Sequence, residues 1–470
     1  MWSRYLKLFS LAFAISSFLI STRCFTIYKN IEKNGKSKFQ HFQIFTVKPE
    51  LPRGMRDLSH QDMQNLEYVR TKFYDTIDCF NFNIIEPSPL ESLSTLEAKS
   101  GKSIINEIYN FKDKAGRDIA LRYDLTVGIT RFAVGKRELR IPIKLANFGG
   151  VFRYDEPQAG RYRYFHQWDI EVYDNFNPET EAEVIEFVSN FFSKLDLDVT
   201  IEINDRRIIE EYLKTKYGIV DENSIGDLFR AIDKVPKKGI KQVCAEYKDI
   251  FDTTILEDIL EICSFTGNIE ELVSHEKIKV LKSIAHLQNL FLSLDFRNIS
   301  NKKVNLGIVR GLDYYSGIVF EVFDKHSNIG SLLGGGRYDK LPSIFDRPDL
   351  GAVGAAGGVE RIILALQYHK KLPSKYKKIV YIANSSESVR NQTVSIISNL
   401  RKNGFATEYD ISNRSLKKQL YDASSKEVFL AIIVGPEEIS MNKVIIRNMK
   451  DGKEIVVNIE DLDKKLSQLL

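Results

Sequence analysis

The chain has 470 residues, which is too long for one compact core, so its length predicts two to four domains. With 43% apolar and 28% charged residues it has the composition of a globular protein, and the absence of low-complexity runs and fixed-period repeats excludes fibrous and repeat architectures. The formal net charge of +4 neither requires nor excludes a polyanionic partner, because local basic patches can bind one.

The four cysteines do not form a pattern that carries chemistry. Cys24, Cys79, Cys244 and Cys263 are scattered, and none forms a CxxC pair. Such spacing predicts neither a disulfide framework nor a zinc site, and no metal ligands are predicted elsewhere in the chain. We expect buried, apolar thiols in a reducing compartment.

The first 50 residues read as a presequence. Leu6–Ile20 is apolar, follows a basic start and is short for a membrane span, as in a secretory signal peptide. Ser21–Pro49 then holds one acid, Glu32, against six Lys and Arg residues, and shows no helical or strand period. This two-part layout resembles the leader of proteins sent to a secondary plastid such as the apicoplast. A mitochondrial presequence, a membrane anchor and a cytoplasmic protein remain alternatives.

Strands and helices alternate irregularly after the presequence. Ser59 or Asp57 is placed to cap the first helix. In the last strand of this part, two-fold alternation exposes Gln167, Asp169 and Glu171 on one face. The pattern predicts a helix over Gln61–Phe80, a strand over Phe82–Leu90, a hairpin over Ile108–Asp124, a helix over Thr126–Val134, and strands over Lys144–Glu156 and Arg161–Asp174.

The middle of the chain is mostly helical. Charged amphipathic segments predict a helical insertion at about 205–295, within a domain that spans 51–370. Further strands are expected over Asp198–Ile203, Asn305–Val309, Gly317–Phe323, Leu332–Leu341 and the glycine-rich Gly351–Gly358, which leads into a helix from Val359.

The C-terminal part, 376–470, follows a linker over His369–Lys378. Regular alternation predicts a small α/β domain with a covered sheet. Its strands are expected over Lys378–Ala383, Ala406–Asp410, Phe429–Gly435 and Lys443–Met449, and its helices over Val389–Gly404, Ser415–Ser424 and Ile459–Leu470.

Four polar clusters lie in strand-like surroundings. Each has an ordinary structural interpretation: Thr126 could simply cap a helix, the arginines could lie on a solvated edge strand, and the two tyrosines could pack in a core. A desolvated guanidinium, however, needs anions to satisfy its five donors, so arginines 153, 161 and 163 favour phosphate or carboxylate ligands. The triple glycine matches no dinucleotide fingerprint or P-loop and more plausibly makes room for a flat substrate. The clusters are Arg122–Thr126, Phe152–Glu171, Arg310–Phe323, and Leu332–Asp339 with Gly351–Ile362.

Taken in order, these segments are specific. RGMRDLS, LRYDLT, FRYDEPQAGRYRYFHQWDIE, RGLDYYSG, GGGRYD and GGVER resemble the motifs of histidyl-tRNA synthetases, which are class II aminoacyl-tRNA synthetases. The resemblance runs from Leu51 to Leu470. It implies an α+β catalytic domain with an antiparallel sheet and helices, a helical insertion and a C-terminal α/β anticodon-binding domain. The EP of IIEPSPL resembles the motif 1 strand, which implies a homodimer.

The resemblance also implies an activity and roles for individual residues. The activity is ATP-dependent ligation of L-histidine to tRNA(His) through a histidyl-adenylate, with Mg²⁺ on the ATP phosphates. Histidine would be bound by Asp124, Leu125, Thr126, Arg153, Gln167, Glu171, Arg310, Tyr314 and Tyr315. ATP would be bound by Arg153, Arg161 and Arg361, and Arg153 and Arg310 would be the catalytic cations.

The sequence departs from the family pattern at several positions. Gly128 stands where proline is usual, and Ser316 replaces threonine. Gly357 replaces a bulky aliphatic residue and is expected to loosen its strand, while Asp155 and Glu156 leave the reading of the first tRNA base pair open. The alternatives are an inactive regulatory paralogue, a synthetase-like module of a kinase, for which no kinase motifs are present, and another class II specificity.

Overall fold

The computed structural model describes residues 49–154, 162–309, 314–373 and 379–470. Within these ranges the chain divides into two compact units, one ending at Leu372 and the other beginning at Pro373. Residues 1–48, residues 155–161 with Asp155, Glu156 and Arg161, and residues 310–313 with Arg310 lie outside the described residues. No helix among the described residues is long and apolar enough to cross a membrane.

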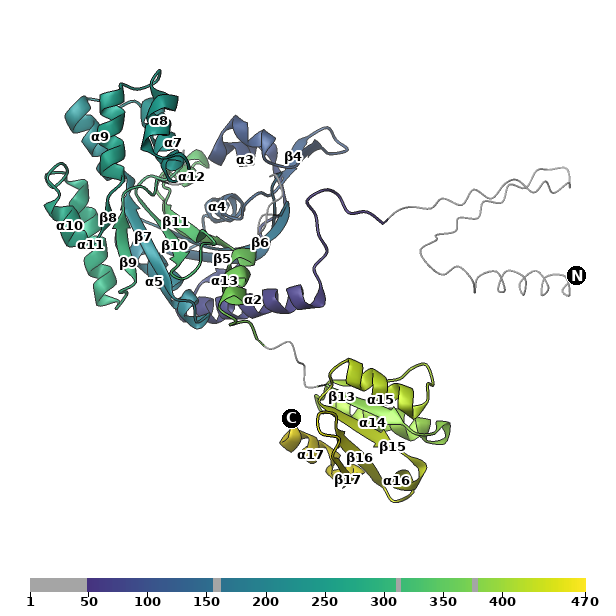
Figure 1. Ribbon diagram of the computed structural model, residues 1–470. Helices are drawn as coiled ribbons and strands as arrows, with labels where there is room; N and C mark the ends of the chain where they lie inside the picture. The colour runs from purple at the N-terminus through teal and green to yellow at the C-terminus, as the bar shows by residue number, and fades with distance from the viewer. Residues whose placement is uncertain (1–48, 155–161, 310–313, 374–378) are drawn as a thin grey trace, which may run out of the picture. The chain divides into compact units, whose positions relative to one another are not determined.

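The first unit is built on a nine-stranded sheet in the order β1-β5-β6-β12-β11-β10-β7-β9-β8 (Figure 1). Neighbouring strands are antiparallel except for the pairs β1/β5 and β7/β9. The strands are β1 (Asn83–Ile84), β5 (Ile143–Phe152), β6 (Tyr164–Asp174), β7 (Val199–Asp205), β8 (Thr266–Gly267), β9 (Lys302–Asn305), β10 (Ile318–Asp324), β11 (Ser331–Arg337) and β12 (Gly351–Gly358).

Helices cover this sheet, and a small antiparallel sheet in the order β2-β4-β3 lies beside it. The expected hairpin is therefore confirmed as β3 and β4, with β2 added to it. The small sheet comprises β2 (Leu90–Ser92), β3 (Asn110–Lys112) and β4 (Asp118–Leu121), and the helices are α2 (His60–Phe80), α3 (Leu93–Ser100), α4 (Thr126–Gly135), α5 (Glu179–Lys194), α12 (Lys340–Ile344) and α13 (Val359–Tyr368).

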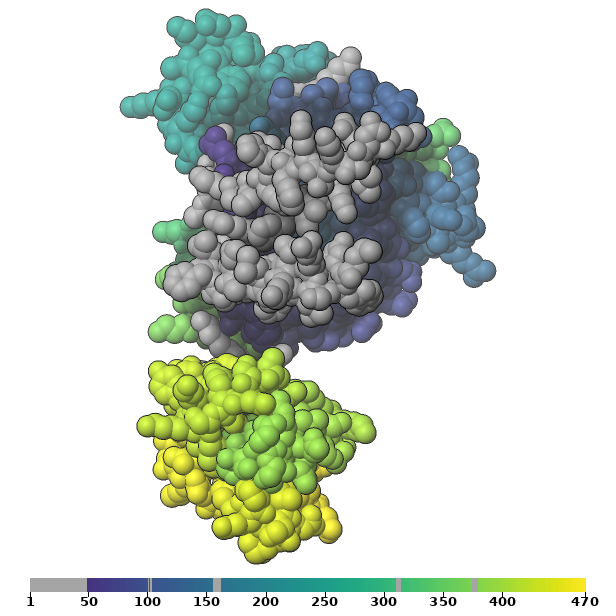
Figure 2. Space-filling view, turned by 90° about the vertical axis from the view of Figure 1, so that its right-hand side faces the viewer, coloured from purple at the N-terminus to yellow at the C-terminus, as the bar shows by residue number. Residues whose placement is uncertain are grey.

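The helices between β7 and β9 gather at one end of the unit, teal in Figures 1 and 2. They pack through a continuous apolar core that also runs under the sheet. They are α6 (Arg206–Tyr212), α7 (Glu222–Lys238), α8 (Ile240–Tyr247), α9 (Thr253–Cys263), α10 (Ile269–Ser274) and α11 (Ser283–Phe296).

The second unit is an α/β domain with a five-stranded sheet in the order β14-β13-β15-β16-β17. The predicted elements are confirmed, and α16 and β17 are additional. The elements are β13 (Val380–Asn384), α14 (Arg390–Lys402), β14 (Thr407–Tyr409), α15 (Leu416–Ser425), β15 (Leu430–Val434), α16 (Pro436–Ser440), β16 (Lys443–Asn448), β17 (Glu454–Asn458) and α17 (Leu462–Leu469).

The two faces of β6 carry different chemistry. Trp168, Ile170 and Val172 pack into the core formed with α2 and α5. The opposite face carries Gln167, Asp169 and Glu171, as predicted, but these side chains are buried rather than exposed. Because β6 is paired on both sides, by β5 and β12, the solvated edge-strand interpretation is wrong.

Two helix starts differ in how they are capped. Ser59 caps α2 in a capping box with Asp62, which confirms one of the two predicted caps. Thr126 does not cap α4, because the helix begins at Thr126 itself. Its hydroxyl instead donates to the carboxyl oxygen of Asp169 at 3.1 Å, so Thr126 faces the sheet.

The strand predicted over Leu332–Leu341 ends at Arg337, and its last two residues begin α12. Two further predicted strands are wrong in part. β9 ends at Asn305, and Leu306–Val309 is not a strand because the side-chain amide of Asn204 takes up the carbonyls of Leu306 and Ile308, at 3.2 and 2.8 Å. The segment before Leu90 pairs only over Asn83–Ile84. In both places the backbone is satisfied by side chains or turns instead of a ladder.

Gly357 does not leave a gap under its strand. A Cβ at this position would lie 2.7 Å from Nε1 of Trp168 and 3.0 Å from Cβ of Leu333. Trp168 therefore fills the space that a bulky aliphatic residue would take, and the expected loosening is wrong. A Cβ at Gly128 would likewise lie 2.8 Å from Cβ of Pro87.

The three cysteines among the described residues follow the prediction with one exception. Cys244 and Cys263 are buried thiols, whereas Cys79 is exposed on α2. Its thiol donates to the carbonyl of Asp75 one helical turn earlier, at 3.2 Å.

Candidate functional site

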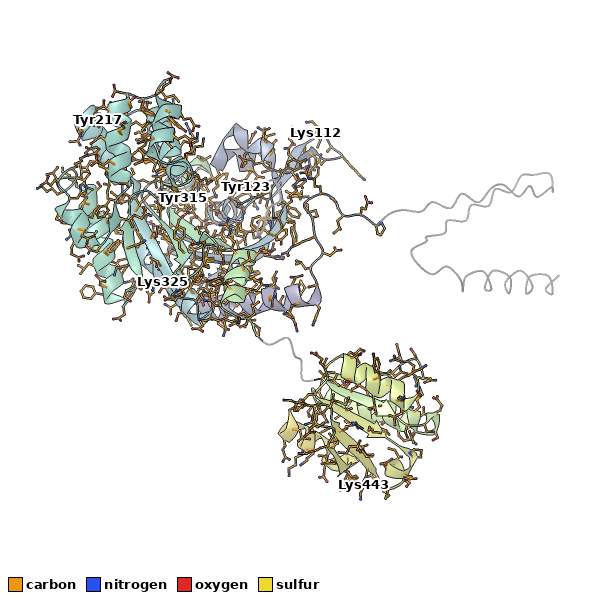
Figure 3. All side chains as sticks on the ribbon, viewed as in Figure 1. Lys112, Tyr123, Tyr217, Tyr315, Lys325 and Lys443 are labelled. Atoms are coloured by element: carbon orange, nitrogen blue, oxygen red, sulfur yellow. The ribbon has the colours of Figure 1, made fainter. Side chains whose placement is uncertain are left out.

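A polar pocket opens on the face of the sheet opposite α2 and α5. Its cavity of about 360 Å³ lies within the range of small-molecule sites. Figure 3 places Tyr123 and Tyr315 in this central region, beside α4 and the sheet. Of the predicted ligands, those that line the pocket are Asp124, Thr126, Arg153, Gln167, Glu171, Tyr314, Tyr315 and Arg361.

One predicted ligand does not line the pocket, and two others lie outside the described residues. Leu125 is fully buried in the apolar core beside α4, so only its backbone could serve a ligand. Arg161 and Arg310 lie outside the described residues, and their roles stay predictions. Arg163 donates to the carbonyl of Arg53 at 3.1 Å and lies over the ring of Tyr154 at 4.1 Å.

An ion pair closes one wall of the pocket. Nζ of Lys99, on α3, donates to the carboxylate of Asp124 at 2.7 Å, and both side chains are less than a tenth exposed. Burial alone would lower the pKa of Lys99, but the charge and hydrogen bond of Asp124, together with the nearby Tyr123 and Tyr315, outweigh burial and raise it. Nζ also lies 4.4 Å from the centre of the Tyr314 ring. The ion pair thereby fixes the position of the Asp124 side chain in the wall of the cavity.

Three tyrosines line the pocket together with Glu171. The rings of Tyr314 and Tyr315 are stacked with their centres 4.2 Å apart, and Tyr338 stands edge-on to both. The hydroxyl of Tyr338 donates to Oε2 of Glu171. Gly354 makes this position possible, because a Cβ there would lie 1.5 Å from Oε2. The result is a rigid group of hydrogen-bonding side chains with aromatic walls.

The pKa of the Glu171 carboxyl group is also shifted from its usual value. Burial raises its pKa to about 7, although hydrogen bonds from Tyr338 and Asp169 oppose the rise. Burial and the charge of Glu171 together raise the pKa of Asp169 well above its usual range. A carboxyl group that titrates near neutrality in a cleft is a candidate functional group.

The raised pKa predicts a stability change for Glu171→Gln. The folded protein binds the Glu171 proton more readily than the unfolded chain, so ionisation costs folding free energy as the pH rises from about 4 to above about 7. We expect the variant to gain roughly 1–3 kcal/mol in free energy of unfolding at about pH 8.

The measurement is urea unfolding followed by the fluorescence of Trp168, the only tryptophan after Trp2. The gain should disappear below about pH 4, where the wild-type group is protonated in both states. A gain that did not change with pH would contradict the assignment.

Two arginine side chains, Arg153 and Arg361, also line the pocket. Nε of Arg153 donates to the carbonyl of Tyr123 at 3.0 Å, and the guanidinium carbon lies 5.2 Å from the centre of the Phe165 ring. Arg361 lies in the first turn of α13, and its Nη1 donates to the carbonyl of Ser331 at 2.7 Å. These backbone bonds orient two guanidinium groups toward the cavity, where they can bind anions.

The glycines of β11 face different sides of the sheet. Gly334 lines the pocket, as expected if glycine makes room for a flat ligand. Gly335 faces the other side of the sheet, where a Cβ would lie 2.4 Å from the ring of Phe320. Only part of the triple glycine therefore belongs to the site.

Sequence reasoning missed several residues of the site. Tyr338 lies in the GGGRYD segment, and this was its only signal. Lys99 lies on a short helix with no motif of its own. The remaining missed residues that line the pocket include Tyr162, Phe165, Ser331 and Glu360. Asp169, which contacts Thr126 and lies beside Glu171, was noticed only as part of an alternating strand.

The arrangement can bind a zwitterion with a polar ring next to a polyanion. Asp124 suits an ammonium group, and Arg153 suits a carboxylate or phosphate. Glu171 and the tyrosines can satisfy both a donor and an acceptor on a ring, and Arg361 lies on the α13 side of the cavity for further anionic groups. An antiparallel sheet that carries such a pocket, in a chain that also holds a separate α/β domain, defines an aminoacyl-tRNA synthetase of class II.

Comparisons with known proteins agree. Residues 54–362 match the family "Histidyl-tRNA synthetase", and residues 379–469 match "Anticodon binding domain". The histidine–tRNA ligase of Methanococcus maripaludis is 32% identical over 87% of this chain and 98% of its own length. That of Pyrococcus abyssi is 32% identical over 90% and 99%.

Solved structures share the fold. The histidyl-tRNA synthetase of Nostoc sp. PCC 7120 superposes with a TM-score of 0.74 at 22% identity, covering 90% of this chain and all of the other. A Bacillus halodurans protein described as an ATP phosphoribosyltransferase regulatory subunit/histidyl-tRNA synthetase gives 0.69 at 22% identity, covering 83% and 99%. The chain belongs to the histidyl-tRNA synthetase family, and the predicted family, enzyme class and fold class are confirmed.

Proposed function

We propose that the chain ligates L-histidine to tRNA(His) in two steps through a histidyl-adenylate. The observation that carries the assignment is the pairing of an imidazole-sized group of Glu171, Tyr314, Tyr315 and Tyr338 with the ammonium site at Asp124. A neutral imidazole offers one donor and one acceptor, and a site built for both rejects side chains that lack them.

The first step brings two anions together. The carboxylate of histidine attacks the α-phosphorus of ATP in line, and pyrophosphate leaves, so positioned cations are the main requirement. Arg153 reaches both the carboxylate and the α-phosphate in this proposal, and Arg361 holds the distal phosphates or stacks on the base. Asp124 and Thr126 hold the α-ammonium group, and Gln167 holds the polar end of the amino acid.

The second step transfers the acyl group to a terminal ribose hydroxyl of tRNA, and adenylate leaves. No nucleophilic Ser or Cys side chain is required, because the ribose hydroxyl is the nucleophile. Arg310 is predicted to lie on the α-phosphate opposite Arg153, and Arg161 to reach phosphate or the acceptor end of the tRNA. The α/β domain of the second unit would bind the anticodon.

Mg²⁺ fits this site as an ion that accompanies ATP. Among the described residues no group of three or more His, Cys, Asp or Glu side chains could hold a metal ion alone. Mg²⁺ typically uses one or two carboxylates together with substrate phosphates, and Glu360, which lines the pocket beside Arg361, could supply one. When bound, the ion neutralises charge on the phosphates of ATP.

The test is ATP–pyrophosphate exchange by protein that begins near Leu51, with each of the twenty amino acids in turn. We expect exchange with histidine alone. Exchange that ignored histidine would reject the proposal, and a protein that bound histidine without any exchange would be the inactive regulatory paralogue. The pocket residues and the C-terminal domain are both present, which favours the active enzyme.

We also propose that the enzyme is a homodimer. Ile84, on the edge strand β1, and Leu90, on β2, are large apolar side chains that are 50% and 43% exposed. This is the segment that resembles motif 1. Sedimentation equilibrium should give twice the mass of the chain, and Ile84→Asp should lower it to one chain. A monomeric wild type at micromolar concentration would contradict this.

The remaining proposal concerns location. We propose delivery to a plastid of the apicoplast type, with a mitochondrial or cytoplasmic enzyme as alternatives, and no stable membrane association after removal of the leader. Residues 1–50 fused to a fluorescent reporter should label the plastid, and a variant in which Leu6–Ile20 is deleted should not. A cytosolic signal from the complete leader would overturn the presequence.

A further inference from the structure

Asp169 is a buried carboxyl group that receives one side-chain hydrogen bond from the described residues. It lies on β6 and is 0% exposed. The hydroxyl of Thr126 donates to its Oδ2 at 3.1 Å, whereas its Oδ1 has no hydrogen-bond partner among the described residues. An ionised carboxylate offers about four acceptor positions, and a single hydroxyl leaves most of them unsatisfied in a dry site.

The flanking strands do not supply the missing donors. Asn147 stands directly opposite Asp169 on β5, so the two side chains point to the same face. Its amide nitrogen already donates to the carbonyl of Ile85 and to Glu86, and its own Oδ1 also lacks a partner among the described residues. Ala356, opposite Asp169 on β12, offers no polar side chain. Asp169 therefore has an acceptor, Oδ1 of Asn147, on one flank and the apolar side chain of Ala356 on the other.

The other charged and titratable neighbours among the described residues already bond to other groups. Lys99 of α3 donates to Asp124. Tyr338, which follows β11, donates to Glu171, and Tyr173 of β6 bonds to Thr130 of α4. Burial and the charge of Glu171 raise the pKa of Asp169 well above its usual range. The two side chains leave the same face of β6 two residues apart, and both are buried.

We propose that Asp169 is a positioning residue that stays protonated in the working enzyme, and that its carboxylic acid donates a hydrogen bond to the carboxylate of Glu171. The pair then carries one negative charge. One proton satisfies the donorless oxygen of Asp169 and fixes Glu171, so that Glu171 accepts the N–H of the substrate ring. This inference rests on the proposed function, because it assigns the ring to the Glu171 side of the pocket.

Two substitutions at Asp169 separate a protonated acid from a carboxylate. Asp169→Asn keeps a neutral side chain with a donor and an acceptor, and we expect its kcat/KM for histidine in exchange at neutral pH to stay within about 3-fold of wild type. Asp169→Ala removes the donor and should lose roughly 10- to 100-fold through KM for histidine, with KM for ATP unchanged, as for one hydrogen bond to a charged group. Equal losses in both variants would overturn the proposal, as would a harmless Asp169→Ala.

Two further readouts do not depend on the alanine variant being folded. The ratio of wild-type to Asp169→Asn activity should fall at alkaline pH, where only the wild type can lose this proton, and titration of histidine itself cancels in the ratio. The infrared difference spectrum of the two proteins at neutral pH should show a carboxylic acid C=O band in the wild type only. A missing band would overturn the protonated acid, whereas a missing histidine-dependent exchange by the wild type would instead reject the proposed function.

Discussion

Arg153→Ala should lower kcat/KM for histidine-dependent ATP–pyrophosphate exchange by about 10²–10³-fold, the loss typical of one preorganised transition-state donor. The guanidinium is held by the carbonyl of Tyr123 and the ring of Phe165, so it is oriented before the substrates arrive. Charge builds up at the α-phosphate as the carboxylate attacks, and the effect should therefore appear in kcat as well as in KM.

Two controls sharpen this prediction. Arg117→Ala removes an arginine of the β3/β4 hairpin that is 78% exposed and paired with Asp113, and it should leave exchange unchanged. Arg153→Lys keeps the charge but not the planar fork and should be intermediate. Exchange by Arg153→Ala at the wild-type rate would remove Arg153 from the mechanism.

Lys99→Met should destabilise the catalytic unit by about 3–5 kcal/mol, because it leaves the buried carboxylate of Asp124 without its cation. The methionine keeps most of the apolar length of the side chain, so the lost charge is the main change. Urea unfolding followed by Trp168 fluorescence measures the effect. Saturating histidine should recover part of the loss, since its ammonium group would pair with Asp124.

The double variant Lys99→Met/Asp124→Asn tests the cause. Removing both charges should recover most of the lost stability, because neither partner is left alone. Exchange activity should not recover, because Asp124 would no longer hold the ammonium group of histidine. Recovery of activity together with stability would show that Asp124 only stabilises the fold.

Local patterns in the sequence predicted which segments form helices and strands better than they predicted which side chains are buried. The alternation in β6 placed Gln167, Asp169 and Glu171 on one face, but alternation cannot tell solvent from a pocket. Burial of that face depends on α4, β5 and β12, and β12 comes from a distant part of the chain. For the same reason the strand expected over Asn305–Val309 failed, because Asn204 takes up its carbonyls from about a hundred residues away.

Site residues that lie in motif-like segments were predicted from the sequence. Residues that join the site only through tertiary contacts were not. Asp124, Arg153, Glu171 and Tyr314 lie in segments that resemble family motifs, and the structure brings them to one pocket. Lys99 enters only because α3 packs beside the segment before α4. No residue near Lys99 marks it as a buried cation, and only its distance to Asp124 does so.

Charging of tRNA(His) with labelled histidine tests the central claim most directly. Protein beginning near Leu51, supplied with ATP, Mg²⁺ and a tRNA(His) transcript, should form acid-precipitable histidyl-tRNA and none with a non-cognate tRNA. Glu171→Ala, which removes the carboxylate from the imidazole site, should abolish the product. Charging by that variant at the wild-type rate, or charging with another amino acid in place of histidine, would contradict the assignment.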